Sequence, residues 1–327
     1  MRREKGLVLG VTTVAITLLL AACGSSSSKN AGSADTVSFS TTDVISTMDP
    51  ALNTDVIGAQ ALTDTMEGLY RYEGKTIKPA IATKVVKPTN NGLTYTFPLR
   101  KDAKWSNGKA VTAEDFVYAW RRVVDPKVGS QYAYIYEGIE NAAAITSGKQ
   151  PVSSLGVVAK DKHTLQVTLE KPIPYFSQLM TSSTFFPVYP DAVKKAGKSY
   201  GTNAKTLVFN GPYKLSGWNG PDSAWKEVKN TNYWNAKAVK VKTLKYQVVK
   251  DPSTALNLFQ SNKLDRTNIS GDTAKQMKND SHYSTQQQAA TFYMQVNQAK
   301  NPIFKNAKIR QAISMTINRK ELVNQVL

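Results

Sequence analysis

The stretch from residue 93 to residue 126 constrains the fold of this 327-residue chain more than any other. Residues 94–99 alternate polar and apolar side chains and are rich in β-branched and aromatic types, which predicts a half-buried strand. The Asn107-Gly108 pair supplies the positive φ angles of a tight turn. Thr112 then predicts a helix N-cap, and Pro126 ends the helix because the residue before a proline avoids the α region. The stretch therefore predicts a strand, a turn and a helix packed together.

The predicted helix has one apolar face, which indicates how it packs. Glu114 and Asp115 fall in its first turn, where negative charge is favourable next to the helix dipole. The apolar face consists of Phe116, Val117, Trp120, Val123 and Val124. We interpret Trp105 and Trp120 as core residues rather than ligand contacts.

The formal net charge of +18 raises the question of a nucleic-acid partner. The lysines and arginines are scattered along the chain, however, and do not form the single basic stripe typical of nucleic-acid binding. We therefore expect no nucleic-acid partner. The favoured interpretation is a solvated basic surface, open to attraction by an anionic cell envelope.

Residues 1–22 have the pattern of an export signal, with Arg2, Arg3 and Lys5 before the apolar run 7–20. A transmembrane anchor would need about 20 apolar residues, and this run is shorter. Leu20-Ala21-Ala22-Cys23 resembles the lipobox of bacterial lipoproteins, so Cys23 is the expected site of cleavage and acylation (palmitate). Residues 23–34 are rich in Gly and Ser and predict a flexible tether.

No catalytic or metal-binding pattern is evident in the sequence. His163 and His282 lie in polar, turn-like contexts, where a surface histidine is expected. No HExxH, CxxC, P-loop, GxGxxG or GxSxG pattern occurs. We therefore expect no enzyme, no metal and no cofactor.

The order of residues in the central stretch carries a family resemblance. Thr96-Phe97, residues 99–108 and residues 111–120 closely resemble the signature of oligopeptide-binding, extracytoplasmic solute-binding lipoproteins of ABC importers. Further matches are Met48-Asp49-Pro50, residues 67–70, residues 171–176 and residues 232–235. The resemblance implies an α/β fold of the periplasmic-binding-protein type (type II, cluster C) with discontinuous lobes.

The resemblance also implies a division of the chain. Lobe I would combine residues 35–66 and 190–289, lobe II would be the insert 67–189, and residues 290–327 would begin lobe III. The family pattern continues beyond Leu327, so we expect a C-terminally truncated chain whose third lobe is incomplete. On that expectation the 327-residue form should bind peptides poorly. Residues 292–297 predict a strand.

Ligand positions are implied only where the family pattern matches locally. Val56 falls where family backbone atoms pair with the peptide, and Asn268 matches an asparagine near the cleft. Tyr132 matches a tyrosine that faces the ligand, with a buried core tyrosine as an open alternative. Tyr293 and Gln295 match a tyrosine and an acidic residue of the site. Gln295 and Thr54 each stand where the family pattern has an acidic residue. The missing negative charges argue against a preference for basic peptides.

The function implied is capture of oligopeptides outside the cytoplasm by a lipid-anchored protein of the cell membrane. Its expected partners are the peptide, the permease subunits of the importer and the membrane, and a monomer is expected. Alternatives within the superfamily are a dipeptide, a peptide pheromone, or a nickel or sugar complex. A basic cell-surface adhesin is the alternative from another class.

Overall fold

The computed structural model describes residues 35–286 and 291–325. Its first sheet brings the start of the described chain beside strands that lie about 200 residues later. The strand order is β1-β9-β8-β7, where β1 runs parallel to β9 and the other pairs are antiparallel. The four strands are β1 (Thr36–Thr41), β7 (Tyr213–Ser216), β8 (Ala224–Lys229) and β9 (Thr243–Val248).

Helix α1 (Val56–Thr65) covers one face of this first sheet. The side chains of Trp225, Leu244 and Tyr246 are buried on that face. The Tyr246 hydroxyl donates to the carboxylate of Asp64 on α1 at 2.9 Å. Alternation of buried and exposed residues along β8 and β9 therefore gives the sheet one core face and one solvent face.

The second sheet, with strand order β4-β6-β5, contains the strand predicted from the central stretch. Its strands are β4 (Thr94–Pro98), β5 (Val157–Asp161) and β6 (Thr164–Thr168), and α2 (Ala113–Val124) packs against β5 and β6. Thr112 and Asp115 form a capping box at the start of α2. The predicted strand, turn and helix are confirmed.

Both tryptophans of the central stretch are fully buried. The Trp105 indole N–H donates to the Asp115 carboxylate at 3.0 Å, and the Trp120 indole N–H donates to the Phe185 carbonyl at 3.0 Å. Burial raises the pKa of Asp115 to about 6. The interpretation of Trp105 and Trp120 as core residues is confirmed.

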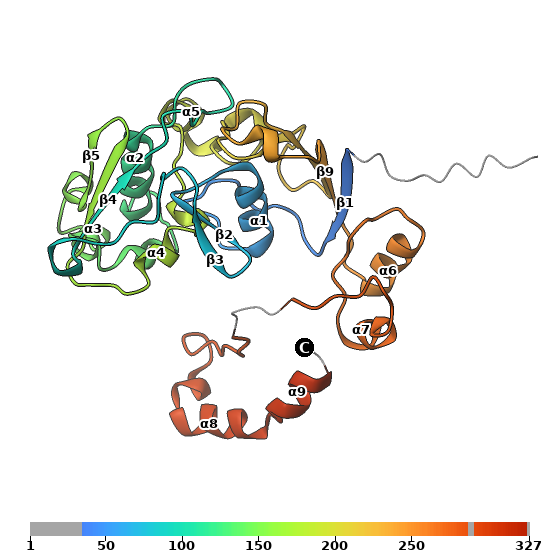
Figure 1. Cartoon of the computed structure of the whole chain (residues 1–327). Helices are drawn as coiled ribbons and strands as arrows, with labels where there is room; N and C mark the ends of the chain where they lie inside the picture. The colour runs from blue at the N-terminus through green and yellow to red at the C-terminus, as the bar shows by residue number, and fades with distance from the viewer. Residues whose placement is uncertain (1–34, 287–290, 326–327) are drawn as a thin grey trace, which may run out of the picture.

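The remaining elements are short. In Figure 1 the two sheets lie on opposite sides of α1 and of the β2–β3 hairpin. The hairpin is β2 (Tyr70–Glu73) and β3 (Thr76–Pro79); the other helices are α3 (Ala142–Thr146), α4 (Phe176–Leu179), α5 (Pro190–Ala196), α6 (Pro252–Gln260), α7 (Gly271–Met277), α8 (Ala307–Thr316) and α9 (Arg319–Gln325). Among the described residues, no helix is long and apolar enough to cross a membrane.

The strand predicted for residues 292–297 is wrong for this structure. Residues 291–297 are irregular, and the side chains of Phe292 and Tyr293 are 70% and 77% exposed. No described strand lies against this segment. A sequence that alternates in the manner of a strand forms one only where a neighbouring strand takes up its backbone hydrogen bonds.

Candidate functional site

Two chain segments leave the first sheet at the edge where β1 and β9 both end. The first is residues 42–55, which connect β1 to α1. The second is residues 265–268, which run parallel to β1: Arg266 pairs with Phe39, and the Ser40 N–H donates to the Arg266 carbonyl at 3.3 Å. In α/β sheets, ligands bind at the carboxyl ends of parallel strands. This edge is therefore the candidate site.

Segment 42–55 is held in place by a buried carboxylate. Asp49 is fully buried and receives both ends of the Arg122 guanidinium from α2, with one N–O distance of 2.6 Å. The Arg122 guanidinium also lies over the Tyr200 ring, 5.5 Å from its centroid. A bidentate ion pair fixes both distance and orientation, so α2 positions this segment relative to the first sheet.

Asp55 sets the exposed position of Val56. Its carboxylate accepts the Gly58 N–H at 2.7 Å and so caps α1, and it also accepts hydrogen bonds from Asn53 and Ser46. Val56 is the first residue of α1 and its side chain is 80% exposed. An apolar side chain so exposed beside a capped helix start is available for contact with a ligand.

Tyr132 lies directly against this segment. Its hydroxyl is 3.4 Å from the Thr54 carbonyl, and its ring makes an edge-on contact with Tyr134 at a centroid distance of 6.1 Å. Tyr134 is 60% exposed and Leu52 is 40% exposed. Residues 52–56 and 132–134 thus place apolar and aromatic side chains together at the surface, which is typical of a recognition site.

The backbone of residues 267–269 offers a second kind of contact. Arg266 uses both its N–H and its carbonyl toward β1, so alternation along a strand turns the N–H and carbonyl of Thr267 to the other side. Within the described chain, no backbone N–H of Thr267, Asn268 or Ile269 donates to another residue. An extended ligand could add to this open edge as a further strand.

The structure brings together some of the residues predicted from the sequence. Tyr132 contacts Thr54, two residues before Val56, and Asn268 lies in the open edge, with its side chain exposed. Tyr293 and Gln295 are exposed in segment 291–297, and no hydrogen bond or ring contact in the described chain joins them to the other three. Tyr134 and Asp55 were not predicted. The aromatic spacing from 132 to 134 was the available signal for Tyr134.

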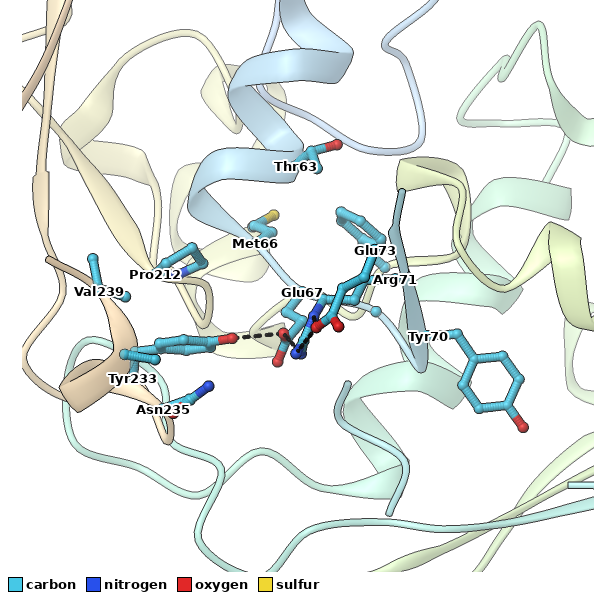
Figure 2. A pocket seen from close by; sticks show the side chains of 13 residues that line it. Thr63, Met66, Glu67, Tyr70, Arg71, Glu73, Pro212, Tyr233, Asn235 and Val239 are labelled. Carbon is cyan, nitrogen blue, oxygen red and sulfur yellow. Dashed lines mark hydrogen bonds and ion pairs between the residues drawn. The ribbon is translucent and has the colours of Figure 1, made fainter. Parts of the chain in front are cut away.

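A cavity of about 320 Å³ lies near the other end of α1. Glu67 lines this cavity and accepts three hydrogen bonds. The donors are the Tyr233 hydroxyl at 2.7 Å, the Trp234 indole N–H at 2.6 Å and the Arg71 guanidinium at 3.2 Å. Figure 2 shows Tyr233 and Arg71 directed at this carboxylate. Burial raises the pKa of Glu67, and the three donors oppose that rise. The cluster joins residues 67–73 to residues 233–234, so its first role is structural.

No group of three or more His, Cys, Asp or Glu side chains in the described ranges could hold a metal ion. An α/β fold with exposed aromatic side chains and an open backbone edge at the ends of parallel strands defines a binding protein of the periplasmic type. The chain belongs to the bacterial extracellular solute-binding proteins of family 5: the model described as "Bacterial extracellular solute-binding proteins, family 5 Middle" matches residues 76–327. The predicted family and fold class are confirmed.

Known relatives agree with this family. The chain is 34% identical to a dipeptide-binding protein of Lactococcus lactis subsp. cremoris, over 98% of this chain and 60% of that protein. It is similar to the structure of the pheromone receptor PrgZ, with a TM-score of 0.86, 38% identity and coverage of 90% and 59% of the two chains. Listeria monocytogenes OppA bound to peptide gives a TM-score of 0.79, 35% identity and coverage of 89% and 58%. The chain thus spans about 60% of the length of these relatives.

Proposed function

We propose that this chain is part of an extracytoplasmic binding protein that captures oligopeptides and delivers them to an ABC importer. The observation that carries the proposal is the open backbone edge at residues 267–269, together with segment 42–55, which leaves the same sheet. That segment leads to the exposed Val56, and the half-exposed Tyr132 contacts it. Backbone contacts are blind to sequence, so such a site accepts many peptides. Membership of a family of solute-binding proteins supports a binding role and not an enzymatic one.

Calorimetry on protein purified from its native source tests the proposal. Mixed peptides of about four to eight residues, which span an extended site at about 3.3 Å per residue, should give saturable heat. Tyr132→Ala should weaken that binding by about three- to tenfold, because an aromatic contact contributes about 0.5–1.5 kcal/mol. Tyr175→Ala is the matched control, since Tyr175 is 59% exposed next to a different helix, α4. Equal peptide affinities of the Tyr132→Ala and Tyr175→Ala variants, or no binding heat from the wild-type protein, would refute the site.

Five residues are proposed ligand contacts: the backbone at Val56 and the side chains of Tyr132, Asn268, Tyr293 and Gln295. Because Gln295 and Thr54 are uncharged, we expect no preference for peptides with basic side chains. Gln295→Glu should then raise the affinity for a lysine-containing peptide over its glutamine counterpart. An unchanged ratio of the two affinities would remove Gln295 from the site.

A dipeptide or a peptide pheromone is the second candidate ligand. The relative in Lactococcus lactis is a dipeptide-binding protein, and PrgZ is a pheromone receptor. Both candidates share the backbone recognition proposed above. A length series from two to eight residues separates them, since a dipeptide site loses affinity as the peptide grows.

We also propose that Cys23 carries lipid and holds the protein at the outer face of the cell membrane as a monomer. The support is the lipobox-like Leu20-Ala21-Ala22-Cys23 after an apolar run. Intact mass of the native protein reads the lipid directly. Cys23→Ala should abolish lipid labelling and leave unprocessed precursor, and persistent labelling would end the idea.

The division into lobe I (35–66 and 190–289), lobe II (67–189) and the start of lobe III (290–327) is part of the same proposal. Pairing of β1 with β9 across the intervening chain supports a discontinuous first lobe.

A further inference from the structure

The face of the first sheet opposite α1 is a mainly polar surface. Along β8, Trp225 and Glu227 point into the core, so Lys226 points to the other side. Along β9, Leu244 and Tyr246 are buried while Lys245 is exposed. We call this second side the outer face.

One cross-strand row of the outer face places two lysines directly opposite each other. The register pairs Ser216 with Lys226, Lys226 with Lys245, and Lys245 with Ser38. Like charges at directly opposite positions destabilise a sheet. Neither the Lys226 nor the Lys245 side chain forms an ion pair or hydrogen bond with another described residue. The row therefore presents two ammonium groups flanked by two hydroxyls, with nothing in the described chain to neutralise them.

The neighbouring row extends the charge. Lys214 lies opposite Val228, which pairs with Thr243, and Thr243 pairs with Thr36. Neither row contains a carboxylate. Asp265 lies at the margin beyond β1, where its carboxylate accepts the Ser38 N–H at 2.7 Å. The outer face is thus cationic over three strands and rich in hydroxyl donors, a chemistry that fits phosphate groups.

The sequence before β1 limits where this face can lie. Asp35, the start of the described chain, lies 12 residues after the proposed lipid-bearing Cys23. Even fully extended, 12 residues span at most about 40 Å. A lipid on Cys23 would therefore hold the start of β1, and with it an edge of the first sheet, within about 40 Å of the membrane.

We propose that the outer face of the first sheet docks on an anionic lipid surface, with Lys214, Lys226 and Lys245 toward the headgroup phosphates. The inference goes beyond peptide capture and uses the proposed anchor only to orient the sheet. Basic residues near an anionic membrane surface add electrostatic attraction to the attachment that the lipid provides. Docking would hold the first sheet by one face and leave its carboxyl edge open to peptide.

Partitioning of the full chain into lipid vesicles tests the proposal. Vesicles of phosphatidylglycerol and phosphatidylcholine are compared with vesicles of phosphatidylcholine alone, at low and high salt. The sheet variant combines Lys214→Gln, Lys226→Gln and Lys245→Gln. The matched control combines Lys195→Gln, Lys198→Gln and Lys205→Gln, which remove the same charge from positions on and near α5. All forms keep the same N-terminal segment, so its own affinity cancels.

Each basic residue near an anionic surface is worth about 1 kcal/mol, so the sheet variant should lose about 100-fold in partition coefficient on the anionic vesicles. The control should lose less than about threefold. Equal losses would mean that net charge alone acts, and no loss would mean that the face does not dock; either result overturns the proposal. If the sheet variant lost binding to soluble polyphosphate but bound anionic vesicles as the wild type does, the docking proposal would be overturned in favour of binding to an anionic wall polymer.

A single charge reversal keeps the test independent of any folding defect. Lys226→Glu would face Lys245 and replace repulsion by attraction, so its melting temperature should not fall while its binding to anionic vesicles drops. If Lys226 had only a structural role in the sheet, Lys226→Glu would change the melting temperature and leave vesicle binding unchanged. That result would overturn the proposal. Peptide calorimetry on the same variants should be unchanged, so failure of docking and failure of peptide capture are read separately.

Discussion

At the scale of single residues, Trp120 combines packing with a satisfied polar group. Its ring meets Tyr136 and Phe185 edge-on, at centroid distances of 5.9 and 5.3 Å, and its N–H is taken by the Phe185 carbonyl. Buried aromatic rings in this geometry stabilise a core beyond the area they bury. The indole is therefore hard to replace.

Trp120→Ala should lower the free energy of unfolding by about 3–5 kcal/mol, as expected for truncation of a fully buried aromatic side chain. Trp120→Phe should lose less, because it keeps most of the volume and gives up the hydrogen bond. Urea unfolding measures both. Weaker peptide binding with unchanged stability in Trp120→Ala would make this residue a ligand contact instead.

Glu227 is a buried carboxyl beside the partly buried carboxyl of Asp64. Burial first, and then the charge of Asp64, raise the pKa of Glu227 well above its ordinary value of 4.5. The folded state therefore keeps a proton that the unfolded chain releases. The stability linked to Glu227 is fully present below about pH 4 and is lost as the pH rises toward the raised pKa of the folded state.

Glu227→Gln should weaken the dependence of the free energy of unfolding on pH. At neutral pH this variant should be at least as stable as the wild type. Unfolding free energies at pH 4 and pH 7 provide the measurement. The control is Glu73→Gln, because Glu73 is exposed and pairs with Arg71 on the surface. A wild type whose stability does not fall between these pH values would contradict the assignment.

The sequence does not identify Glu227 as a core residue, because Lys226 and Glu227 are adjacent charged residues and only Glu227 is buried. Its burial depends on α1, which packs there from about 160 residues earlier in the chain. Tyr132 shows the same limit: sequence left a ligand contact and a core residue equally open, and its half-exposed position depends on Thr54 of a distant segment.

At the scale of elements, segment 42–55 and helix α2 act as one unit. Asp49 and Arg122 connect them through the bidentate ion pair, in which the Asp49 side chain is 1% exposed. Removing one partner of a buried pair leaves an uncompensated charge, which costs more than the pair itself contributes.

Arg122→Met should therefore lower the free energy of unfolding by about 3–5 kcal/mol. The adjacent Arg121→Met is the control; Arg121 donates to the Ser153 carbonyl and has no ion pair within the described chain. The double variant Asp49→Asn with Arg122→Met should recover part of the loss. Chemical unfolding of the three variants decides, and equal effects of Arg121→Met and Arg122→Met would argue against the pair.

Elements with a local cause were predicted correctly from the sequence. The capping box at Thr112 and the apolar face of α2 specify the helix without reference to distant residues. Segment 292–297 has the residue types of a strand but no described partner strand. Whether a partner strand lies beside it depends on the tertiary structure and cannot be predicted from the segment itself.

At the scale of the whole molecule, burial is unevenly distributed. The described elements from β1 to β9 share one hydrophobic core, whereas η8 (Pro302–Lys305) and α8 contain no buried residue. Met315 is 84% exposed and Val323 is 56% exposed. A segment with so few buried contacts opens at little cost in free energy.

Limited trypsin digestion should therefore cut at Lys300, Lys305 or Lys308 long before it cuts within α2 or the sheets. A stable fragment that ends at Lys300, Lys305 or Lys308 is the expected product, identified by mass spectrometry. Hydrogen exchange should show the same boundary, with α8 exchanging at least about 100-fold faster than β9, since opening free energies range from near zero to the global value. Equal protection of α8 and β9 would contradict this prediction.

The parallel pairing of β1 with β9 also affects when the first sheet can form during synthesis of the chain. Asp35 and Lys242, which form an ion pair where the two strands begin, are 207 residues apart in sequence. A chain synthesised at about 5–20 residues per second needs about 10–40 seconds to bring β9 out after β1. For that interval β1 has no parallel partner, and closure of so long a loop is slow. We expect the first sheet to form only after most of the described chain has been made, which leaves the N-terminal segment time to engage an export pathway while the body behind it is still unfolded.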